Sequence, residues 1–257
     1  MTLSIVILTC NQCGHTMRLL RSLAPYLADH TDTDVVLVDN GSTDDTDAEL
    51  SAWKASLPRI APRIKVIRLS ENRGVAGGRN IGISAASGEL LLILDNDTVV
   101  NAGALDGLRR HIAANPSCGI CAPALRAPDG ELQSSAKPYP GPLLKLAHIV
   151  RPGRELERER VEMRKPHPWY VIGACQMMRH STYDAVGPLD EGIFYGPEDA
   201  DYCARVRRAG LTIDYLPEFE IIHDWRRATR RSPLSRLGRL HIRALFHFWI
   251  KHSTPKL

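Results

Sequence analysis

No apolar run in the 257-residue sequence is long enough to cross a membrane, since the longest clean stretches, such as residues 90–94, have the length of a strand. A spanning helix needs about 18 or more such residues, so we expect none. The N-terminus lacks both a basic stretch before an apolar segment and a small-residue cleavage site, and we expect a strand there instead of a signal peptide. With 44% hydrophobic and 24% charged residues, the composition is that of an ordinary soluble globular protein, and we expect a cytoplasmic location.

Acidic residues are missing from residues 226–257, which carry nine lysines and arginines. Removing those nine from the 33 basic residues of the whole chain leaves 24 beside all 29 acids, so the rest of the chain has a net charge of −5. A mildly acidic body with a basic tail predicts an anionic partner for the tail. Charge alone leaves a membrane surface, a pyrophosphate and a nucleic acid as alternatives.

The six cysteines include two Cys-x-x-Cys pairs, Cys10 with Cys13 and Cys118 with Cys121. The two pairs lie farther apart in the sequence than the pairs of a usual zinc site. Cys10 also ends an apolar strand, and the second pair flanks another. We therefore expect free thiols in a reducing cytosol rather than a metal site or a disulfide.

Strands and helices alternate in the first half of the chain. The predicted strands are residues 3–9, 35–38, 65–69 and 89–94, and the predicted helices are residues 16–27, 44–57, 75–87 and 102–114. Residues 3–9 form a continuous apolar run, as expected of a strand that is covered on both faces. The alternation predicts an α/β fold, with an open, mostly parallel, Rossmann-like sheet and helices on both faces.

After residue 115 the pattern changes. We expect a turn at 128–130 between two short strands, and an exposed helix or mobile loop over the Arg- and Glu-rich residues 151–165. A central strand at 171–178 and a helix at 198–209 follow. The last predicted elements are a short strand at 219–222 and an amphipathic helix at 234–251. We find no internal repeat or low-complexity tract, and we expect one domain followed by a C-terminal helical extension.

Polar residues follow three of the predicted strands at the point where each strand ends. They are Thr9 and Asn11 after the first strand, Asp39 and Asn40 after the second, and Asp95, Asn96 and Asp97 after the fourth. Ligands of open parallel sheets bind beyond the carboxyl ends of the strands, so we expect these side chains to face one crevice.

Asp95 and Asp97 are the strongest indication of chemistry. Two carboxylates two residues apart repel each other unless a cation lies between them, and Mg²⁺ or Mn²⁺ takes such oxygen ligands while bridging to phosphates. The alternative is that Asp97 or Asn101 caps the helix Ala102–Ala114. Because the acids follow an apolar strand and accompany other polar strand ends, we favour a metal site. His223 becomes a further metal ligand only if the fold brings it to Asp97.

Two further groups are candidates for binding and catalysis. Asn72 and Gly74 lie in a turn that opens a helix, where phosphates bind well, and Arg79 in that helix adds a positive charge. Close packing of the helix on the sheet is the alternative role of the glycines in this turn. Glu198 and Asp199 open another helix, where they either balance the helix dipole or supply a base that removes the proton of an acceptor hydroxyl.

Taken in this order, the motifs resemble those of the family 2 glycosyltransferases of GT-A fold, over nearly the whole chain. The matching segments are residues 4–11, 38–44, 72–74 with 79–82, 95–97, 173–177 and 196–201. Residues 128–133 and the Tyr139-Pro140 pair are most similar to the rhamnosyltransferase-like branch. The resemblance implies an inverting transfer of a sugar from a UDP- or dTDP-sugar, with dTDP-rhamnose as a candidate, to a hydroxyl acceptor in a cell-surface polysaccharide, glycolipid or natural product.

The resemblance also implies a role for each candidate. The base and ribose of the nucleotide sugar would contact Thr9, Asn11 and Asp39, and the ribose or a metal-bound water would contact Asp95. The pyrophosphate would contact Arg79. The other residues expected at the nucleotide sugar are Asn40, Asn72, Gly74 and Asn96. Asp97 and His223 would bind Mg²⁺ or Mn²⁺ on the diphosphate. Asp199 is the expected base, with Glu198 orienting the acceptor.

By the same resemblance, residues 1–225 form the GT-A domain, in which about residues 1–115 bind the nucleotide and about residues 116–225 bind the acceptor. Residues 226–257 then form a basic amphipathic helix, for which we expect contact with anionic lipid or a lipid-linked acceptor at the inner face of the membrane, and no nucleic acid. Packing of this helix on the domain's own core is the alternative.

Two other functions fit a similar core, a sugar nucleotidyltransferase and a catalytically silent, membrane-docking module. A nucleotidyltransferase typically carries a glycine-rich basic loop directly after the first strand, whereas residues 9–13 contain neither Lys nor Arg. The silent module is the less favoured alternative because the acidic clusters are intact.

Overall fold

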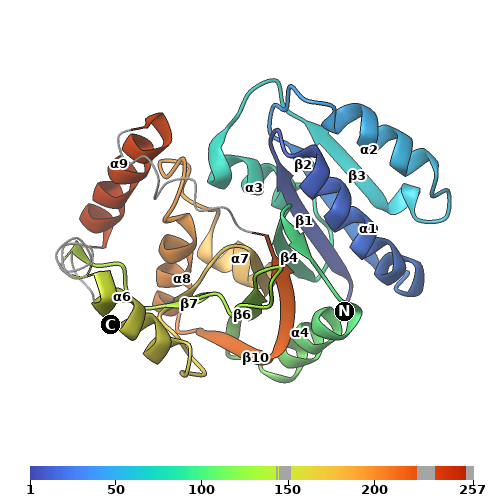
Figure 1. Cartoon of the computed structure of the whole chain (residues 1–257). Helices are drawn as coiled ribbons and strands as arrows, with labels where there is room; N and C mark the ends of the chain where they lie inside the picture. Colours follow the sequence, from blue (N-terminus) through green and yellow to red (C-terminus); the bar gives the residue numbers. More distant parts are fainter. Residues whose placement is uncertain (143, 145–151, 225–234, 253–257) are drawn as a thin grey trace.

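The computed structural model describes residues 1–142, 144, 152–224 and 235–252 (Figure 1). Its strands are β1 (Leu3–Thr9), β2 (Thr33–Asp39), β3 (Ile64–Arg68), β4 (Leu90–Asp95), β5 (Thr98–Val99), β6 (Cys118–Arg126), β7 (Ala136–Lys137), β8 (Tyr170–Val171), β9 (Cys175–Arg179) and β10 (Thr212–His223). Its helices are α1 (Cys13–Asp29), α2 (Thr46–Ala55), the 3₁₀ helix η1 (Ala61–Arg63), α3 (Gly74–Ser84), α4 (Ala102–Ala114), α6 (Pro152–Glu162), α7 (His180–Val186), α8 (Glu198–Arg208) and α9 (Arg236–Lys251).

Eight strands form one sheet in the order β3-β2-β1-β4-β9-β6-β10-β5. β1 pairs in parallel with β2 and β4, and β2 pairs in parallel with β3, so the carboxyl ends of these strands meet at one edge. β9 is antiparallel to both of its neighbours, and β5 is antiparallel to β10, which itself runs parallel to β6. The sheet is therefore mostly parallel, and the predicted α/β class is confirmed.

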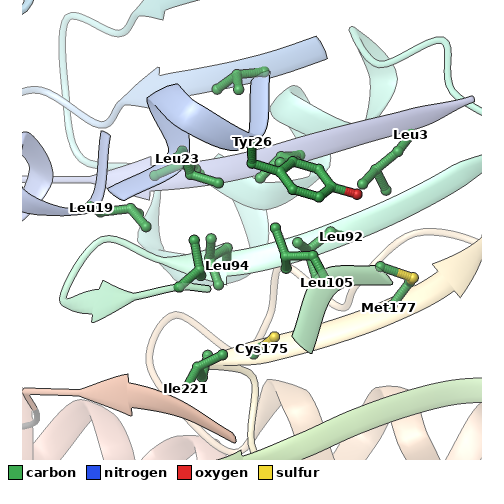
Figure 2. Close-up of a cluster of buried hydrophobic side chains, with 14 of the residues drawn as sticks. Leu3, Leu19, Leu23, Tyr26, Leu92, Leu94, Leu105, Cys175, Met177 and Ile221 are labelled. Carbon is green, nitrogen blue, oxygen red and sulfur yellow. The ribbon is translucent and has the colours of Figure 1, made fainter. Parts of the chain in front are cut away.

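Helices cover both faces of the sheet because its central strands are apolar on both sides. Leu92 and Leu94 of β4 lie in a buried cluster with Leu23 of α1 and Leu105 of α4 (Figure 2). Ile93, which alternates with them, lies in the cluster on the opposite face, together with side chains of α3 and α8. This alternation explains why the strands have continuous apolar sequences.

Helix α3 lies very close to the sheet because glycines face it. A Cβ atom on Gly82 would lie 2.5 Å from Cγ1 of Val6, and one on Gly78 would lie 2.4 Å from Cδ1 of Leu8. Gly78, in the glycine-containing segment 72–80, therefore has the packing role that was the alternative for these glycines, and Gly82 shares it. The close approach also brings Arg79 of this helix to the end of β4.

The prediction of one central strand over residues 171–178 is wrong. These residues form β8, which pairs with β7 in a separate two-stranded sheet, and β9, which lies between β4 and β6. The residues between them leave the ladder because their backbone groups have other partners. The carbonyl of Gly173 accepts from Arg79, its N–H donates to Asp199, and the carbonyl of Ala174 accepts from the N–H of Asp95.

Two more expectations are corrected. The last strand of the body is not the short segment 219–222 but the 12-residue β10, whose pairing with β6 shifts register between Leu216 and Glu220. Residues 152–162 of the Arg- and Glu-rich segment form helix α6, which was one of the two alternatives for this segment. That helix is not wholly exposed, since Glu159 and Glu162 are buried, and Glu159 pairs with Lys137 at 2.5 Å.

The C-terminal helix α9 begins at Arg236, where the side chain of Ser235 caps it by accepting from the N–H of Gly238 at 3.1 Å. Leu245 and Phe248 are buried, so the described part of the helix packs on the domain, which was the alternative expectation. Residues 226–234 and 253–257 of the predicted extension lie outside the described residues. Among the described helices, none combines the length and the hydropathy that a bilayer crossing requires.

Candidate active site

A cavity of about 650 Å³ lies where the carboxyl ends of β1 and β4 meet the start of α3, the start of α8 and helix α9. Most of the residues that the sequence singled out line it, namely Thr9, Asn40, Asn72, Gly74, Arg79, Asp95, Asn96, Asp97, Glu198, Asp199 and His223. Asn11 and Asp39 are not among the lining residues. The fold therefore brings the predicted strand-end clusters to one crevice.

Asn11 and Asp39 instead join the loops that follow β1 and β2. Asn11 adopts a left-handed backbone conformation with φ +52°, and its Oδ1 accepts from the N–H of Thr43 at 2.6 Å. Oδ1 of Asp39 accepts from the N–H of Ser42 at 2.9 Å, and the hydroxyl of Ser42 accepts from the N–H of Asn11. These bonds fix the shape of the loops at the edge of the cavity, and a contact of either side chain with a nucleotide stays a prediction.

The turn that opens α3 is held by two asparagine side chains. Asn40 accepts from the N–H of Arg73 at 2.8 Å and donates to the carbonyl of Gly74 at 3.1 Å. Asn72 accepts from the N–H of Gly74 at 2.8 Å. Gly74 has φ +74°, and a Cβ atom there would lie 2.7 Å from the carbonyl oxygen of Phe194, so only glycine fits this close approach.

Thr9 and Asn96 form a buried polar network at the floor of the cavity. The amide of Asn96 donates to Oγ1 of Thr9 at 3.1 Å and to Oγ1 of Thr16 at 3.0 Å, and the two threonine hydroxyls lie 2.7 Å apart. Thr9 is 1% exposed. The network ties the ends of β1 and β4 to α1, which holds the neighbouring acids in place.

Arg79 lies at the centre of the site, only 4% exposed. Its Nη2 donates to Oδ1 of Asp95 at 2.5 Å and to the carbonyl of Gly173 at 2.9 Å, and its Nη1 donates to Oε1 of Glu198 at 3.3 Å. Burial opposes the charge of Arg79, but the two carboxylates outweigh it and raise the pKa of the guanidinium. Burial also raises the pKa of Asp95, against the lowering effect of Arg79.

The group formed by Asp95, Asp97 and His223 fits a divalent cation. The ligand atoms of these three side chains lie within 4.8 Å of one another, and Oδ1 of Asp97 is 3.4 Å from Nε2 of His223. Oδ1 of Asp97 is buried and has no hydrogen-bond partner within the described part of the chain, as expected of an oxygen that a cation would satisfy. A pair of carboxylate oxygens with one imidazole is a donor set that Mg²⁺ or Mn²⁺ accepts.

Gln133 orients the imidazole of His223, a role that the sequence analysis did not assign. Its Oε1 lies 2.7 Å from Nδ1 of His223, and its Nε2 donates to the carbonyl of His223 at 2.8 Å. The hydrogen bond assigns the proton to Nδ1, which leaves Nε2 as the nitrogen that faces Asp97. Gln133 lies in the segment that resembles the rhamnosyltransferase-like branch, and this was the only signal for it.

Asp199 is placed at the start of α8 by backbone groups. Its Oδ2 accepts from the N–H of Gly173 at 3.2 Å, and its Oδ1 accepts from the N–H of Ala200 at 2.7 Å. Burial raises the pKa of Asp199 to about 7, and the neighbouring charge of Glu198 adds to the rise. A carboxyl group with this pKa changes its protonation near neutral pH, as a general base needs to do.

The sequence analysis missed the far wall of the cavity. Lys137, Tyr195, His241 and Leu245 also line it. His241 and Leu245 belong to α9, which the sequence treated as an extension apart from the catalytic domain. Nδ1 of His241 lies 3.4 Å from the carbonyl oxygen of Tyr195, so α9 directly adjoins the loop that precedes α8.

Known proteins are similar to this chain in sequence and in fold. Residues 4–187 match the sequence profile of glycosyl transferase family 2. An N-acetylglucosaminyl-diphospho-decaprenol L-rhamnosyltransferase of Mycobacterium tuberculosis is 28% identical, over 98% of this chain and 85% of its own length. This similarity confirms the resemblance to the rhamnosyltransferase-like branch.

Two solved structures share the fold at 18% identity. The mannosyltransferase PcManGT from Pyrobaculum calidifontis, in complex with GDP-Man and Mn²⁺, has a TM-score of 0.66 over 88% of this chain and 57% of its own. TarS 1–349 of S. aureus, in complex with UDP-GlcNAc, has a TM-score of 0.67 over 100% of this chain and 68% of its own. The fold is thus the GT-A fold, and, because the family profile covers most of the sequence, the chain belongs to glycosyl transferase family 2.

Proposed function

We propose that the protein is a metal-dependent, inverting glycosyltransferase that moves a sugar from a UDP- or dTDP-sugar to a hydroxyl acceptor. The observation that supports this most is the convergence of two groups in one cavity. One group is the possible cation site of Asp95, Asp97 and His223, and the other is the acid pair Glu198 and Asp199 on α8. In metal-dependent transfer from a nucleotide diphosphate sugar, a cation neutralises the departing diphosphate and a base removes the proton of the acceptor. The first group would hold the cation, and the second would supply the base.

In this proposal the donor and the acceptor occupy different parts of the chain. About residues 1–115 bind the nucleotide, and about residues 116–225, with the cavity-lining residues of α9, bind the acceptor. The curated relative is named as an L-rhamnosyltransferase that acts on N-acetylglucosaminyl-diphospho-decaprenol. By analogy with it, dTDP-rhamnose is the preferred candidate donor and a lipid-linked pyrophosphate is the preferred candidate acceptor, which sets the reaction at the cytoplasmic face of a membrane.

The proposed reaction is an in-line displacement. Asp97 and His223 would hold Mg²⁺ or Mn²⁺, which supplies charge neutralisation for the departing diphosphate. The acceptor oxygen attacks the anomeric carbon on the face opposite the diphosphate, while the bond from that carbon to the diphosphate oxygen breaks. The hydroxyl proton passes to the carboxylate of Asp199, and the anomeric configuration inverts. Glu198, fixed by Arg79, orients the acceptor.

Thermal stabilisation by a panel of nucleotide sugars, with and without Mn²⁺, tests the proposal. We expect one UDP- or dTDP-sugar to raise the melting temperature only when Mn²⁺ is present. Asp97→Ala should abolish this stabilisation, whereas Asp199→Asn should keep it and lose turnover. Asp184→Asn changes an exposed acid on α7 and serves as the matched control. If Asp199→Asn turns over at the wild-type rate, the assignment of the base is wrong.

The same assay separates the alternative functions. A sugar nucleotidyltransferase would be stabilised by UTP or dTTP more than by any nucleotide diphosphate sugar. A catalytically silent module would show no stabilisation by either class of nucleotide. Either result contradicts the transferase proposal, whereas turnover of a nucleotide sugar with an inverted anomeric centre supports it.

A further inference from the structure

Helix α9 carries apolar side chains on two faces, and among the residues that the structure describes only one of these faces is buried against the domain. Leu245 and Phe248 point inward and are 9% and 0% exposed. Ile242, Phe246 and Ile250 are 44%, 57% and 77% exposed. Because these three lie four residues apart, they form a single line along the outer side of the helix.

Cationic side chains flank this apolar line. Arg239 and Arg243 are both exposed, and the helical spacing places them beside Phe246 on the same outer face. On the other side of the line, the ring of Trp249 lies 5.3 Å from that of Phe246, edge to face. Trp249 is itself held by a hydrogen bond from Nε1 to the carbonyl of Pro140 at 2.8 Å. We refer to Arg239, Ile242, Arg243, Phe246 and Ile250 as the docking face.

The docking face has a fixed orientation because polar contacts hold α9 against the domain. Nε2 of His252 and Nζ of Lys251 each lie 2.8 Å from Oδ1 of Asp201, which is fully buried in α8. Lys251 and His247 also contact Asp190, at 2.6 and 3.0 Å. Figure 1 shows α9 at the rim of the molecule, beside α8 and on the side away from α1 and α2.

The inner side of the same helix forms part of the active-site cavity. His241 and Leu245 line the cavity. A helix is only about 10 Å across, so a partner bound to the docking face lies about one helix diameter from the cavity wall. The docking face is therefore well placed to bring this wall of the site close to whatever surface it binds.

We propose that the docking face binds an anionic lipid bilayer. A bilayer offers both an apolar layer for the three aliphatic and aromatic side chains and negative headgroups for the arginines. A nucleic acid would match the charge but would leave the exposed apolar line without a use. A second copy of this chain would cover the apolar line but would bring two basic segments together, since residues 226–257 hold nine cations and no acid.

Bilayer binding goes beyond the proposed reaction, because it needs neither a donor nor turnover. It also gives a physical reason for a lipid-linked acceptor. With the docking face at the headgroup level, the cavity wall formed by His241 and Leu245 lies next to the interface where the pyrophosphate of such an acceptor is exposed.

Co-sedimentation of the full chain with vesicles tests the inference. We expect binding to mixed phosphatidylglycerol and phosphatidylcholine vesicles that weakens as salt is added, and little binding to pure phosphatidylcholine. The double variant Ile242→Ser/Phe246→Ser should lower the affinity at least about tenfold, because two apolar side chains that would insert into the bilayer are lost. Arg239→Glu/Arg243→Glu should lower it by roughly fivefold or more for each arginine.

Two control variants remove similar groups from other surfaces. Leu132→Ser removes a side chain that is 43% exposed beside β6, close to the 44% of Ile242, and Arg110→Glu reverses an exposed charge on α4. Both should bind vesicles like the wild type. Circular dichroism and thermal melting show whether each variant is folded. If the double variant melts early, the single variant Ile250→Ser, at the most exposed position of the apolar line, tests the same face.

The outcomes also separate this inference from the proposed reaction. If wild-type protein stays in the supernatant with anionic vesicles but still binds a nucleotide sugar, the docking face is wrong and the transferase proposal stands. If the protein binds anionic vesicles but no nucleotide sugar, the docking face stands and the transferase proposal is wrong. A concentration-dependent dimer in analytical ultracentrifugation that disappears in Ile242→Ser/Phe246→Ser, without vesicle binding, would assign the face to a second copy and overturn the inference.

Discussion

The buried guanidinium of Arg79 pairs with the partly exposed carboxylate of Asp95, with Nη2 2.5 Å from Oδ1, and this ion pair joins helix α3 to the end of β4. The same guanidinium reaches Glu198 at the start of α8 with Nη1. One cation therefore links an acid of the proposed donor site with an acid of the proposed acceptor site. A direct contact of Arg79 with pyrophosphate stays a prediction, whereas its position between the acids is a feature of the fold.

Replacing Arg79 with Met should therefore destabilise the protein as well as inactivate it. The substitution keeps the apolar stem but leaves Asp95 and the buried Glu198 without their counter-ion, and breaking the buried pair with Glu198 costs about 3 kcal/mol or more. The free energy of unfolding, measured by urea denaturation, checks the prediction. Arg110→Met on the exposed side of α4 is the matched control and should change it little. A loss within about 0.5 kcal/mol of the control would contradict the role of Arg79 as the link.

Gln133 should control metal affinity through His223. Gln133→Leu removes the hydrogen bond to Nδ1 but keeps a side chain of similar size, so the imidazole loses its fixed orientation. Loss of such a partner typically lowers metal affinity about 10- to 100-fold. Titration of Mn²⁺ in the presence of UDP measures the change. Glu131→Gln, exposed in the same segment, should leave the affinity unchanged, and an equal effect in both variants would rule out the orienting role.

The raised pKa of Asp199 predicts a pH dependence of turnover. Burial first, and the charge of Glu198 second, raise this pKa to about 7, so the carboxyl group is protonated and unable to accept a proton at lower pH. We expect kcat/KM to fall about tenfold per pH unit below that pKa and to reach a plateau above it. Glu198→Gln removes the neighbouring negative charge and should move the inflection to lower pH. A profile that is flat from about pH 6 to 8 would contradict Asp199 as the base.

The same pKa predicts the effect of Asp199 on stability. A carboxyl group whose folded-state pKa lies above its unfolded value binds more protons in the folded state. Its contribution to the free energy of unfolding therefore falls as the pH rises from about 4 to about 7. Asp199→Asn removes this titration, and the variant should therefore be inactive yet more stable than the wild type above pH 7. Thermal melting at several pH values measures the difference, and a less stable Asp199→Asn variant at pH 8 would show that the carboxylate has a structural role.

The strands of the first half of the chain, and the edge of the sheet at which their polar ends meet, were predictable because both depend on local patterns. Continuous apolar runs mark strands that are buried on both faces, and parallel strands carry their following residues to one edge. This reasoning located Thr9, Asp95 and Asp97 correctly at one crevice. It also set the condition for His223, and the fold does bring that residue to within 3.4 Å of Asp97.

The remaining features depend on contacts between distant segments, which no local pattern encodes. The apolar run 171–178 is interrupted because the backbone of Gly173 forms hydrogen bonds with the side chains of Arg79 and Asp199. The hydrophobicity of the sequence alone does not indicate such partners. His241 joins the cavity only because α9 folds back onto α8. The sequence predicted an amphipathic helix here, but it did not show that Ile242, Phe246 and Ile250 form a second, outward-facing apolar line beside Arg239 and Arg243.

The attachment of α9 leads to a prediction about Asp201. This carboxylate is fully buried, with Oδ1 2.8 Å from Nε2 of His252 and from Nζ of Lys251, and Oδ2 3.0 Å from Nε of Arg205. Asp201→Ala leaves Lys251 and Arg205 without their buried counter-ion and His252 without its hydrogen-bond partner, so it should destabilise the protein by about 3 kcal/mol or more and release α9. Limited proteolysis should then cut first within α9, whereas Asp184→Asn on α7 should be digested like the wild type.

Asp201 should also contribute to acid sensitivity. Burial raises its pKa, but the hydrogen bonds from His252 and Lys251 outweigh this and hold the pKa below the ordinary value of 3.8. A carboxyl group with a lowered folded-state pKa adds stability that is present above the unfolded value and is lost as the pH falls through the folded one. Acid unfolding monitored by circular dichroism should therefore lose less stability below about pH 4 in Asp201→Asn than in the wild type. If the free energy of unfolding falls equally steeply with pH in the two proteins, α9 is held by its apolar face alone, through Leu245 and Phe248.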